Sequence, residues 1–204
     1  MTVPPPMSAD GVLDHIGPGA DVIVPLACGE PPTLIEALDR HHERLERVRV
    51  HQMHALYDHP YLHGAAGDHL RHVSYFLSPV TRPAYWDGTV DLVPANFSEM
   101  PRTLRDHTRC SVVLAAASPP DKHGYFSLGT NADYVAPLIG HVPFFLEVME
   151  GMPRTAGQNQ LHHTQVLGYV ESGRTPPEVP PIAPDARDEA IADLLKVEPG
   201  TPLV

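Results

Sequence analysis

Residues 111–117, Ser-Val-Val-Leu-Ala-Ala-Ala, form an apolar run without alternation, and residues 118–129, Ser-Pro-Pro-Asp-Lys-His-Gly-Tyr-Phe-Ser-Leu-Gly, follow it directly. A continuous apolar run is typical of a strand that a parallel sheet covers on both faces. The prolines end this strand, Asp121 is placed to bond the backbone two residues on, and the glycines permit unusual backbone angles. Ligands of open α/β sheets bind beyond the carboxyl ends of strands, so the pattern predicts a strand that ends in a functional loop. An ordinary connecting loop is the alternative interpretation.

A second junction of the same kind lies near the N-terminus. Residues 21–27, Asp-Val-Ile-Val-Pro-Leu-Ala, read as a buried strand that runs into Cys-Gly-Glu-Pro-Pro at 28–32. Thr33 and Glu36 have the spacing of a capping box, which predicts that a helix starts near Leu34. The chain therefore has two strand-to-loop junctions at which a ligand site can form.

The helix predicted after the second junction has a packing face and a functional end. Leu34, Leu38 and Leu45 recur at helical spacing, so we expect this face to pack on the sheet. The free backbone N–H groups of the helix would point into the loop around Gly29, where the helix dipole favours an anion or a developing oxyanion. Gly29 has no Cβ, which would let a substrate carbonyl approach the backbone. Glu30 is most simply a charge at the helix entrance.

Length and composition fit one α/β domain. A chain of 204 residues with 42% hydrophobic content can bury a substantial core. The formal net charge of −11, with 14 lysines and arginines spread along the chain, argues against nucleic acid as a partner. Apolar runs fall well under the ~20 residues that a membrane span needs, and residues 1–7 show no secretory start. Cys28 and Cys110 lie in or beside apolar strands, so we expect reduced cysteines in a cytoplasmic protein.

The 14 histidines invite a metal interpretation. The group that most suggests one comprises His51, His54, His59, His63, His69 and His72. Their spacing contains no helical pair at i and i+4 that encloses a glutamate, and no nearby cysteine completes a structural zinc site. We therefore expect no metal site. His51 and His54 follow a predicted strand at 48–50 and would reach the same cleft as the two loops.

Both ends of the chain read as attachments to a central domain. Residues 1–14 begin with a proline-rich stretch and are predicted to be a flexible N-terminus, and residues 15–183 are predicted to form the α/β domain. The segment 174–184 is a proline-rich connector without regular structure. A last helix with an apolar side is expected to open at Asp185 and to end before Pro199.

Five blocks of sequence occur in the same order as in a known family. They are Gly-Ala-Asp-Val-Ile-Val at 19–24, Gly-Glu-Pro at 29–31, Val-Pro to Ser-Glu-Met-Pro at 93–101, the loop at 118–129, and Met-Pro-Arg-Thr-x-Gly at 152–157. Together they resemble the N-terminal half of the acetyl-CoA hydrolase/transferase family, which includes 4-hydroxybutyrate CoA-transferase. The resemblance runs from about residue 15 to about residue 195, and the block at 118–129 is its most specific part.

The resemblance implies a CoA-transferase-like α/β fold, with a mostly parallel open sheet and helices on both faces. It implies an enzyme that moves CoA between small carboxylic acids through a glutamyl intermediate, with an acyl-CoA thioester as substrate and no permanently bound cofactor. In the family the nucleophilic glutamate lies in the second half of a chain roughly twice this length. The helix within 184–204 would lead toward that second domain, or a partner subunit would supply it, in an oligomer. Hydrolase and transferase activity both remain open.

No residue of this chain is therefore predicted to be catalytic. The glutamates near the motif loops lie outside the family's nucleophile context; they are Glu30, Glu99, Glu147 and Glu150. The residues expected to line the acyl and CoA side of the site are Gly29, Asn96, Ser98, Asp121, Gly124, Tyr125 and Gly129. Among them, Asp121 is expected to form the loop rather than to act as an acid.

Four arginines near the motif blocks are candidates for contacts to CoA phosphates, although a solvated surface position is the favoured interpretation for each. They are Arg102, Arg105, Arg109 and Arg154. His162 and His163 lie just beyond the Met-Pro-Arg block, where the family often carries a histidine. A structural or substrate-orienting role for His162 is a hypothesis.

The chain departs from the family pattern at three positions. Glu150 stands where the family usually has asparagine, and Pro137 and Pro143 interrupt a region that the family runs as a helix and a strand. That helix is predicted to be short and to end near Gly140. These changes fit a second hypothesis, a non-catalytic acyl-CoA-binding or regulatory protein that keeps the fold. A metal-dependent hydrolase is a third, which a bound zinc would favour.

Overall fold

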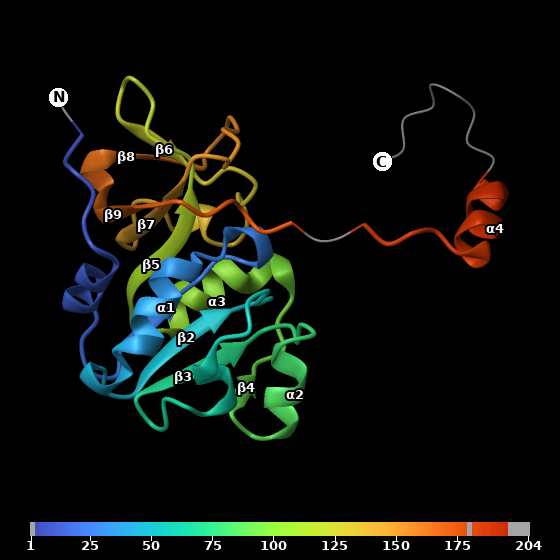
Figure 1. The fold of residues 1–204 in the computed structure, drawn as a ribbon, viewed down its shortest axis with the longest axis horizontal. Helices are drawn as coiled ribbons and strands as arrows, with labels where there is room; N and C mark the ends of the chain where they lie inside the picture. The colour runs from blue at the N-terminus through green and yellow to red at the C-terminus, as the bar shows by residue number, and fades with distance from the viewer. Residues whose placement is uncertain (1–2, 179–180, 196–204) are drawn as a thin grey trace.

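A seven-stranded parallel sheet forms the centre of the structure, a computed structural model that describes residues 3–178 and 181–195 (Figure 1). The strand order is β4-β3-β2-β1-β5-β7-β9. These strands are β1 (Asp21–Ile23), β2 (Val48–Gln52), β3 (Leu70–Ser74), β4 (Val90–Leu92), β5 (Cys110–Ala117), β7 (Phe144–Met149) and β9 (Val166–Ser172). A separate antiparallel ribbon pairs β6 (Tyr125–Ser127) with β8 (Gln160–His162). The predicted α/β fold class with a mostly parallel open sheet is confirmed.

Helices and short 3-10 turns connect the strands. The α-helices of the described residues are α1 (Pro32–Arg40), α2 (Thr81–Trp86), α3 (Met100–His107) and α4 (Ala186–Leu195). The 3-10 turns are η1 (Ala9–His15), η2 (Ala27–Gly29), η3 (His42–Arg44), η4 (Pro60–His63), η5 (Phe97–Glu99), η6 (Ala136–Leu138) and η7 (His163–Gln165). The helix expected to end near Gly140 is the single turn η6, as predicted from Pro137 and Pro143.

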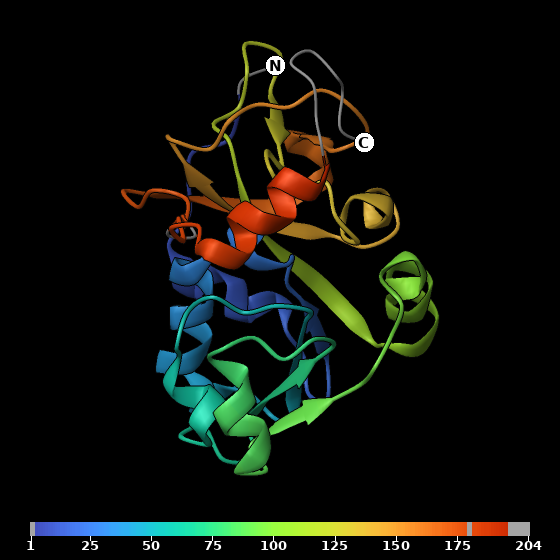
Figure 2. The same ribbon diagram turned by 90° about the vertical axis from the view of Figure 1, so that its right-hand side faces the viewer.

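Alternating residues of β1 enter two separate cores, which places helices on both faces of the sheet. Val22 packs in one core with Leu34 of α1. Ile23 packs in the other core with Met100 and Leu104 of α3. Figure 2 shows the sheet between α1 and α3. Every residue of β5 from Val112 onward is buried, because both layers cover this central strand.

Two elements end earlier than the sequence predicts. β1 stops at Ile23 rather than at Ala27, because Pro25 has no N–H to donate to a ladder and the chain turns into η2. α1 stops at Arg40. Leu45 is nevertheless buried, with 3% of its surface exposed, and it reaches the core from the turn after η3 rather than from the helix. The helical spacing of the leucines therefore predicted burial correctly and helix length incorrectly.

The proline-rich N-terminus packs along the domain, so the prediction of a flexible segment over 1–14 is wrong for its described part. Leu13 in η1 is only 5% exposed. The Met7 N–H donates to the carbonyl of Tyr169 at 2.8 Å, and the Tyr169 hydroxyl donates to Pro4 O at 2.8 Å. An extended proline-rich segment matches the edge of β9, which offers unpaired backbone groups.

The predicted C-terminal helix is present as α4, which lies away from the sheet at the end of an extended connector (Figure 1). All of its described side chains are exposed, including Ile191 at 58% and Leu194 at 80%. The expected end of the helix before Pro199 lies outside the described residues. Between residues 174 and 185 the described part of the connector has no helix or strand, as predicted.

His72 is a fully buried histidine that makes folding sensitive to acid. Its Nδ1 lies 3.0 Å from the Tyr61 hydroxyl, and its Nε2 has no partner among the described residues. Burial lowers the pKa of His72 from 6.5 to about 3, with smaller contributions from the charges of His51 and His59. The unfolded chain therefore binds a proton here before the folded one does. The stabilisation is complete above pH 6.5 and is lost as the pH falls toward 3, at up to about 1.4 kcal/mol per pH unit.

We expect the His72→Asn variant to lose this acid sensitivity, because asparagine keeps a polar atom near Tyr61 but does not titrate. Urea unfolding at a series of pH values from roughly 7 to 4 measures the slope for both proteins. The natural chain should show the steeper decline in the free energy of unfolding. Parallel slopes would show that His72 protonates in the folded state.

Candidate functional site

The loops after β1 and β5 lie at the switch point of the sheet. β2, β3 and β4 extend to one side of β1, and β5, β7 and β9 extend to the other. Chains leaving the carboxyl ends of β1 and β5 therefore turn in opposite directions and leave a crevice between them. This is the position at which open parallel sheets bind ligands, and both predicted functional loops reach it.

The loop after β5 is shaped by Asp121 in the way the sequence predicts. Oδ1 of Asp121 accepts hydrogen bonds from the N–H groups of His123 at 2.8 Å and of Tyr125 at 2.9 Å. These backbone donors and the nearby Arg154 lower the pKa of Asp121. Gly124 completes the turn with a φ of +84°. Asp121 forms the loop as an ionised group and is not available as an acid.

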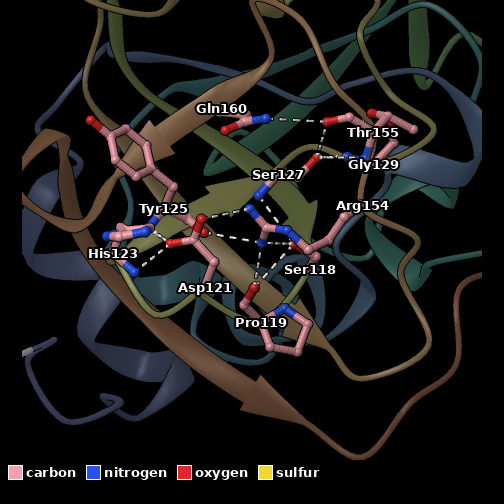
Figure 3. A network of polar contacts seen from close by, with 10 residues as sticks. All are labelled: Ser118, Pro119, Asp121, His123, Tyr125, Ser127, Gly129, Arg154, Thr155 and Gln160. Atoms are coloured by element: carbon pink, nitrogen blue, oxygen red, sulfur yellow. Dashed lines mark hydrogen bonds and ion pairs between the residues drawn. The ribbon is translucent and has the colours of Figure 1, made fainter.

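Arg154 ties this loop to the Met-Pro-Arg block (Figure 3). Its Nη1 donates to Ser118 Oγ at 3.0 Å, to Pro119 O at 2.9 Å and to Tyr125 O at 3.0 Å. Its Nη2 lies 3.5 Å from Asp121 Oδ2. Arg154 lies at the surface, with 37% of its side chain exposed, but its guanidinium also bonds both ends of the loop and holds them together.

We expect Arg154→Ala to loosen the loop at 118–125 without unfolding the domain, because the guanidinium is partly exposed and contacts only loop atoms. Amide hydrogen exchange at Tyr125 and Ser127 measures the effect, which should be at least tenfold faster exchange, or about 1.4 kcal/mol of lost local stability. Arg102→Ala is the matched control, since Arg102 is 82% exposed and lies on α3. Equal exchange in both variants would contradict the role of Arg154.

Ser127 makes the second link between the two motif blocks. Its Oγ accepts from the N–H groups of Gly129 at 3.1 Å and of Thr155 at 3.2 Å, and donates to Thr155 O at 3.3 Å. Thr155 Oγ1 in turn donates to Gly129 O at 2.6 Å. Figure 3 shows these bonds beside the Arg154 cluster. Residues far apart in the sequence thus form one rigid polar unit at the end of β5.

In the loop after β1, Gly29 packs against other residues of the domain and leaves no open space for a substrate. A Cβ on Gly29 would lie 2.6 Å from both Asn131 Cγ and Pro25 Cβ, and Gly29 is buried. The expectation that its missing side chain leaves room for a substrate carbonyl is therefore wrong. Ala27, two residues earlier, has a φ of +47°, an uncommon conformation for alanine that fixes the direction of the turn.

The N-terminus of α1 is occupied, so the predicted anion site at this helix is wrong. The Thr33 N–H donates to Glu147 Oε2 at 2.7 Å and the Thr33 hydroxyl to Glu147 Oε1 at 2.6 Å, while Leu34 N–H lies 3.4 Å from Oε2. Glu147 belongs to β7 and is fully buried, and burial raises its pKa although the bonds from Thr33 lower it. The predicted capping box fails because Thr33 bonds Glu147 instead of the backbone of its own helix.

Glu30 is also buried, with 1% of its surface exposed, so it is not a solvated charge at the helix entrance. Its Oε2 accepts from Leu56 N–H at 2.8 Å and from Gln52 Nε2 at 3.1 Å. Its Oε1 lies 3.3 Å from His59 Nε2. This carboxylate joins the loop after β1 to the loop after β2 and has no free side toward the crevice.

Asp133 is a half-buried carboxyl group at the crevice that the sequence reasoning missed. Its Oδ2 accepts from the Leu26 N–H and its Oδ1 from the Val135 N–H, both at 2.9 Å. Burial raises its pKa to about 6, against these two bonds. It lines a cavity of about 550 Å³ together with His141, Gln158, Gln160 and neighbouring apolar residues. No spacing or motif singles out Asp133, because its partner Leu26 lies 107 residues away.

The predicted lining residues fall into three groups. Asp121, Tyr125 and Gly129 share the Arg154 and Ser127 network, and the Gly124 N–H donates to Asp121 O at 2.9 Å. Gly29 lies on the loop after β1, on the opposite side of the crevice, and packs against the Asn131 side chain. Asn96 and Ser98 are exposed on the segment after β4, where Phe97 packs edge-on to Tyr134 with ring centroids 6.2 Å apart. That each of these residues contacts substrate stays a prediction.

The other predicted arginines lie on or after α3, and Arg109 precedes β5 at the amino edge of the sheet. Arg105 pairs with Asp106 at 2.9 Å on the exposed side of α3. Because Arg109 stands at the opposite end of β5 from the loop at 118–129, its side chain is remote from the crevice. Among the four arginines, only Arg154 is bonded into the loop network.

The histidines have structural partners. His51 lies between Asp21 Oδ1 at 3.1 Å and the Tyr75 hydroxyl at 2.9 Å. His162 Nδ1 accepts from Thr164 N–H and caps η7. Gly124 fits against this histidine pair, since a Cβ there would lie 2.6 Å from the His163 ring. Within residues 3–178 and 181–195, no group of three or more His, Cys, Asp or Glu side chains is placed to hold a metal ion.

Solved structures place this fold in a defined class. RipA from Yersinia pestis superposes with a TM-score of 0.83 and 27% identity, over 92% of this chain and 48% of that one. The 4-hydroxybutyrate CoA-transferase of Porphyromonas gingivalis superposes with a TM-score of 0.67 and 26% identity, over 87% of this chain and 41% of that one. The fold is therefore that of a CoA-transferase-like α/β domain.

Sequence comparison identifies the family. The acetyl-CoA hydrolase/transferase N-terminal domain matches residues 6–177, so the chain belongs to the acetyl-CoA hydrolase/transferase family, as the resemblance predicted. It is 32% identical over 182 residues to the succinyl-CoA:cyclohexane-1-carboxylate CoA transferase of Geobacter metallireducens, and 29% identical over 177 residues to the 4-hydroxybutyrate coenzyme A transferase of Clostridium kluyveri. These matches cover 87% and 86% of this chain but 41% of each relative. The chain thus spans less than half the length of these relatives.

None of the helices in the described ranges is long and apolar enough to cross a membrane.

Proposed function

We propose that this chain is the N-terminal half of an enzyme that transfers CoA between small carboxylic acids, with the nucleophilic glutamate on a second domain or subunit. One observation carries the proposal. Arg154 and Ser127 bond the motif block at 118–129 to the block at 152–157, at the switch point of the sheet. Family membership and the named activities of the full-length relatives support it.

The chemistry divides one difficult exchange into easier steps. The glutamate carboxylate attacks the thioester carbonyl, the C–S bond breaks, and the released CoA thiolate attacks the glutamyl carbonyl to form a glutamyl-CoA thioester. The first acid leaves as a carboxylate, and an incoming acid then takes the CoA by the reverse steps. Each step passes through an oxyanion that a fixed donor stabilises.

In the part of the site that this chain forms, we assign the backbone N–H of Cys28 as the donor to this oxyanion. In the loop after β1, Ala27 N–H is bonded to His54 O, Gly29 N–H to Leu26 O, and Leu26 N–H to Asp133. The N–H of Cys28 has no such bond among the described residues. Glu147 already bonds the N–H groups at the start of α1. We therefore assign the Cys28 N–H, rather than the helix N-terminus, as the donor to the oxyanion.

The buried carboxylates at the carboxyl ends of the described strands are not free to act as the nucleophile, and the exposed Glu150 lies outside the family's nucleophile context. Glu30 and Glu147 are both buried and bonded on their oxygens. Asp121 is held by backbone donors. The isolated 204-residue chain should therefore bind acyl-CoA weakly and turn over nothing, and an oligomer or a longer chain should complete the site.

Exchange of CoA between an acyl-CoA and a labelled acid tests the proposal. The purified 204-residue chain should show no exchange, and the chain joined to its second half, covalently or as a subunit, should restore it. Exchange by the chain alone would overturn the division of labour. No exchange by the complete assembly would favour the alternative, a non-catalytic acyl-CoA-binding or regulatory protein.

A further inference from the structure

We propose that the acyl group held at this site is apolar and uncharged beyond its thioester, and that Phe76, Val93 and Phe97 form the wall it contacts. This inference rests on the proposed function and specifies its substrate class. The three side chains lie on the loops that leave β3 and β4, on the same carboxyl edge of the sheet as the two motif loops.

These residues are large apolar side chains that the domain leaves in water. Phe76 is 60% exposed, Phe97 is 51% exposed and Val93 is 41% exposed. Phe76 directly follows the buried Tyr75, whereas Val93 and Phe97 lie in a stretch of exposed and partly exposed residues. Burial of such surface is worth about 25 cal/mol per Å², which a ligand that covers it gains on binding.

Contacts link Phe97 to Phe76 through Tyr134 and the segment that contains Met53 and His54. Phe97 packs edge-on to Tyr134, whose hydroxyl accepts from the N–H of Met53 at 3.1 Å. The next residue, His54, stacks near Phe76 with ring centroids 5.8 Å apart. Leu26, Met53 and Ala95 are partly buried members of the core beneath. The surface therefore runs from the loop after β1 to the segment after β4.

The charge around this surface selects against a second carboxylate on the acyl group. Residues 25–31, 53–60, 75–80 and 93–99, which leave β1 to β4, contain no lysine or arginine. Burial lowers the pKa of His54, so this side chain is neutral at pH 7. Two arginines from neighbouring elements are paired with carboxylates, since Arg102 lies 3.5 Å from Asp106 and Arg174 lies 2.7 Å from Glu36, while Arg82 donates to Leu77 O at 3.3 Å.

The carboxylates that border the surface add to this selection. Glu99 accepts from Asn96 at 3.1 Å and is exposed, and Asp58 lies 2.6 Å from His63. Asp133 has a pKa of about 6 and is largely ionised at pH 7. An acyl chain that ends in a carboxylate would approach these groups without a cation to pair with, whereas a hydrocarbon chain meets only apolar atoms.

NMR titration of the 204-residue chain with CoA, hexanoyl-CoA and succinyl-CoA tests the inference. We expect hexanoyl-CoA to bind at least tenfold more tightly than succinyl-CoA, because each buried methylene contributes about fourfold and the charged end contributes nothing favourable. Shifts in the Phe76 and Phe97 rings and the Met53 methyl should appear with hexanoyl-CoA and not with CoA.

Two variants distinguish specific contact between the acyl chain and Phe97 from nonspecific hydrophobic binding. Phe97→Ala should weaken hexanoyl-CoA binding at least fivefold while leaving CoA binding unchanged. Trp86→Ala is the matched control, since Trp86 is 78% exposed on α2 and should affect neither ligand.

The outcomes distinguish this inference from the function on which it rests. Absence of binding by all three CoA compounds would overturn the proposed function and the inference together. Binding of both thioesters with equal affinity, or a preference for succinyl-CoA through Arg82, would overturn the inference alone. Tight hexanoyl-CoA binding without shifts at Phe76 and Phe97 would also overturn it, and would leave the surface as an interface for another protein segment.

Discussion

Replacing Glu147 by alanine is expected to lower the free energy of unfolding by about 3 kcal/mol, because the donors at the start of α1 lose their buried acceptor. The Thr33 hydroxyl and the Thr33 and Leu34 N–H groups would lose their acceptor at the start of α1. These donors lie against the sheet, where water reaches them poorly. A cavity would add to the cost, since Glu147 is fully buried on β7.

Urea unfolding of Glu147→Ala and of two companion variants measures this effect. Glu36→Ala removes a carboxylate of the same helix that pairs with Arg174 on the surface, and we expect it to cost about 1 kcal/mol or less. Thr33→Ala removes one hydroxyl and should cost about 1 kcal/mol. If Glu147→Ala is no more costly than Glu36→Ala, the cap on α1 does not stabilise the domain.

Gly129→Ala is expected to destabilise the domain by about 3 kcal/mol, because it combines backbone strain with a collision. Gly129 has a φ of +63°, which alanine resists. A Cβ there would lie 2.4 Å from Met152 Sδ and 2.8 Å from Pro153 O. The methionine side chain can move, but the carbonyl belongs to the backbone of the Met-Pro-Arg block. The substitution should therefore push the two motif blocks apart.

Gly19→Ala is the matched control for the strain alone. Gly19 has a nearly equal φ of +65°, and a Cβ there would have no heavy atom within 4 Å. We expect this variant to cost about 1 kcal/mol. Thermal or urea unfolding of both variants gives the difference, which is the cost of the collision. Equal destabilisation would show that the blocks at 118–129 and 152–157 are not held in close contact.

The parts of the fold that the sequence predicts are those set by neighbours along the chain. The apolar run at 111–117 is β5, and Asp121 bonds the N–H two residues on, as its position in a proline and glycine loop indicates. Pro137 and Pro143 limit η6 to a single turn for the same local reason. In each case the physical cause lies within a few residues of the effect.

The parts that the sequence does not predict depend on partners far along the chain. Thr33 has the spacing of a capping box, but it bonds Glu147, which lies 114 residues away. Asp133 gains its partner across 107 residues, and Glu30 gains Gln52 from the end of β2 and His59 from the loop after it. Spacing along the chain carries no information about such contacts, so these carboxylates read as unremarkable surface charges.

The carboxylates of this chain differ in role from the nucleophilic glutamate that we propose on a second domain or subunit. Those of this chain shape the crevice, because each buried one is bonded by backbone or side-chain donors. Among the described residues, the exposed Glu150 lies outside the family's nucleophile context, so we propose that a second domain or subunit completes the site. Family membership supplies the reaction class, and the apolar surface at Phe76 and Phe97 supplies the expectation for its acyl group.

The most direct test of this account is to locate the covalent CoA adduct by peptide mass spectrometry, after incubating the chain and its completed assembly with acyl-CoA. We predict that the adduct forms only in the completed assembly and lies on a glutamate outside residues 1–204. A CoA adduct on any glutamate of this chain, such as Glu30 or Glu147, would contradict the account.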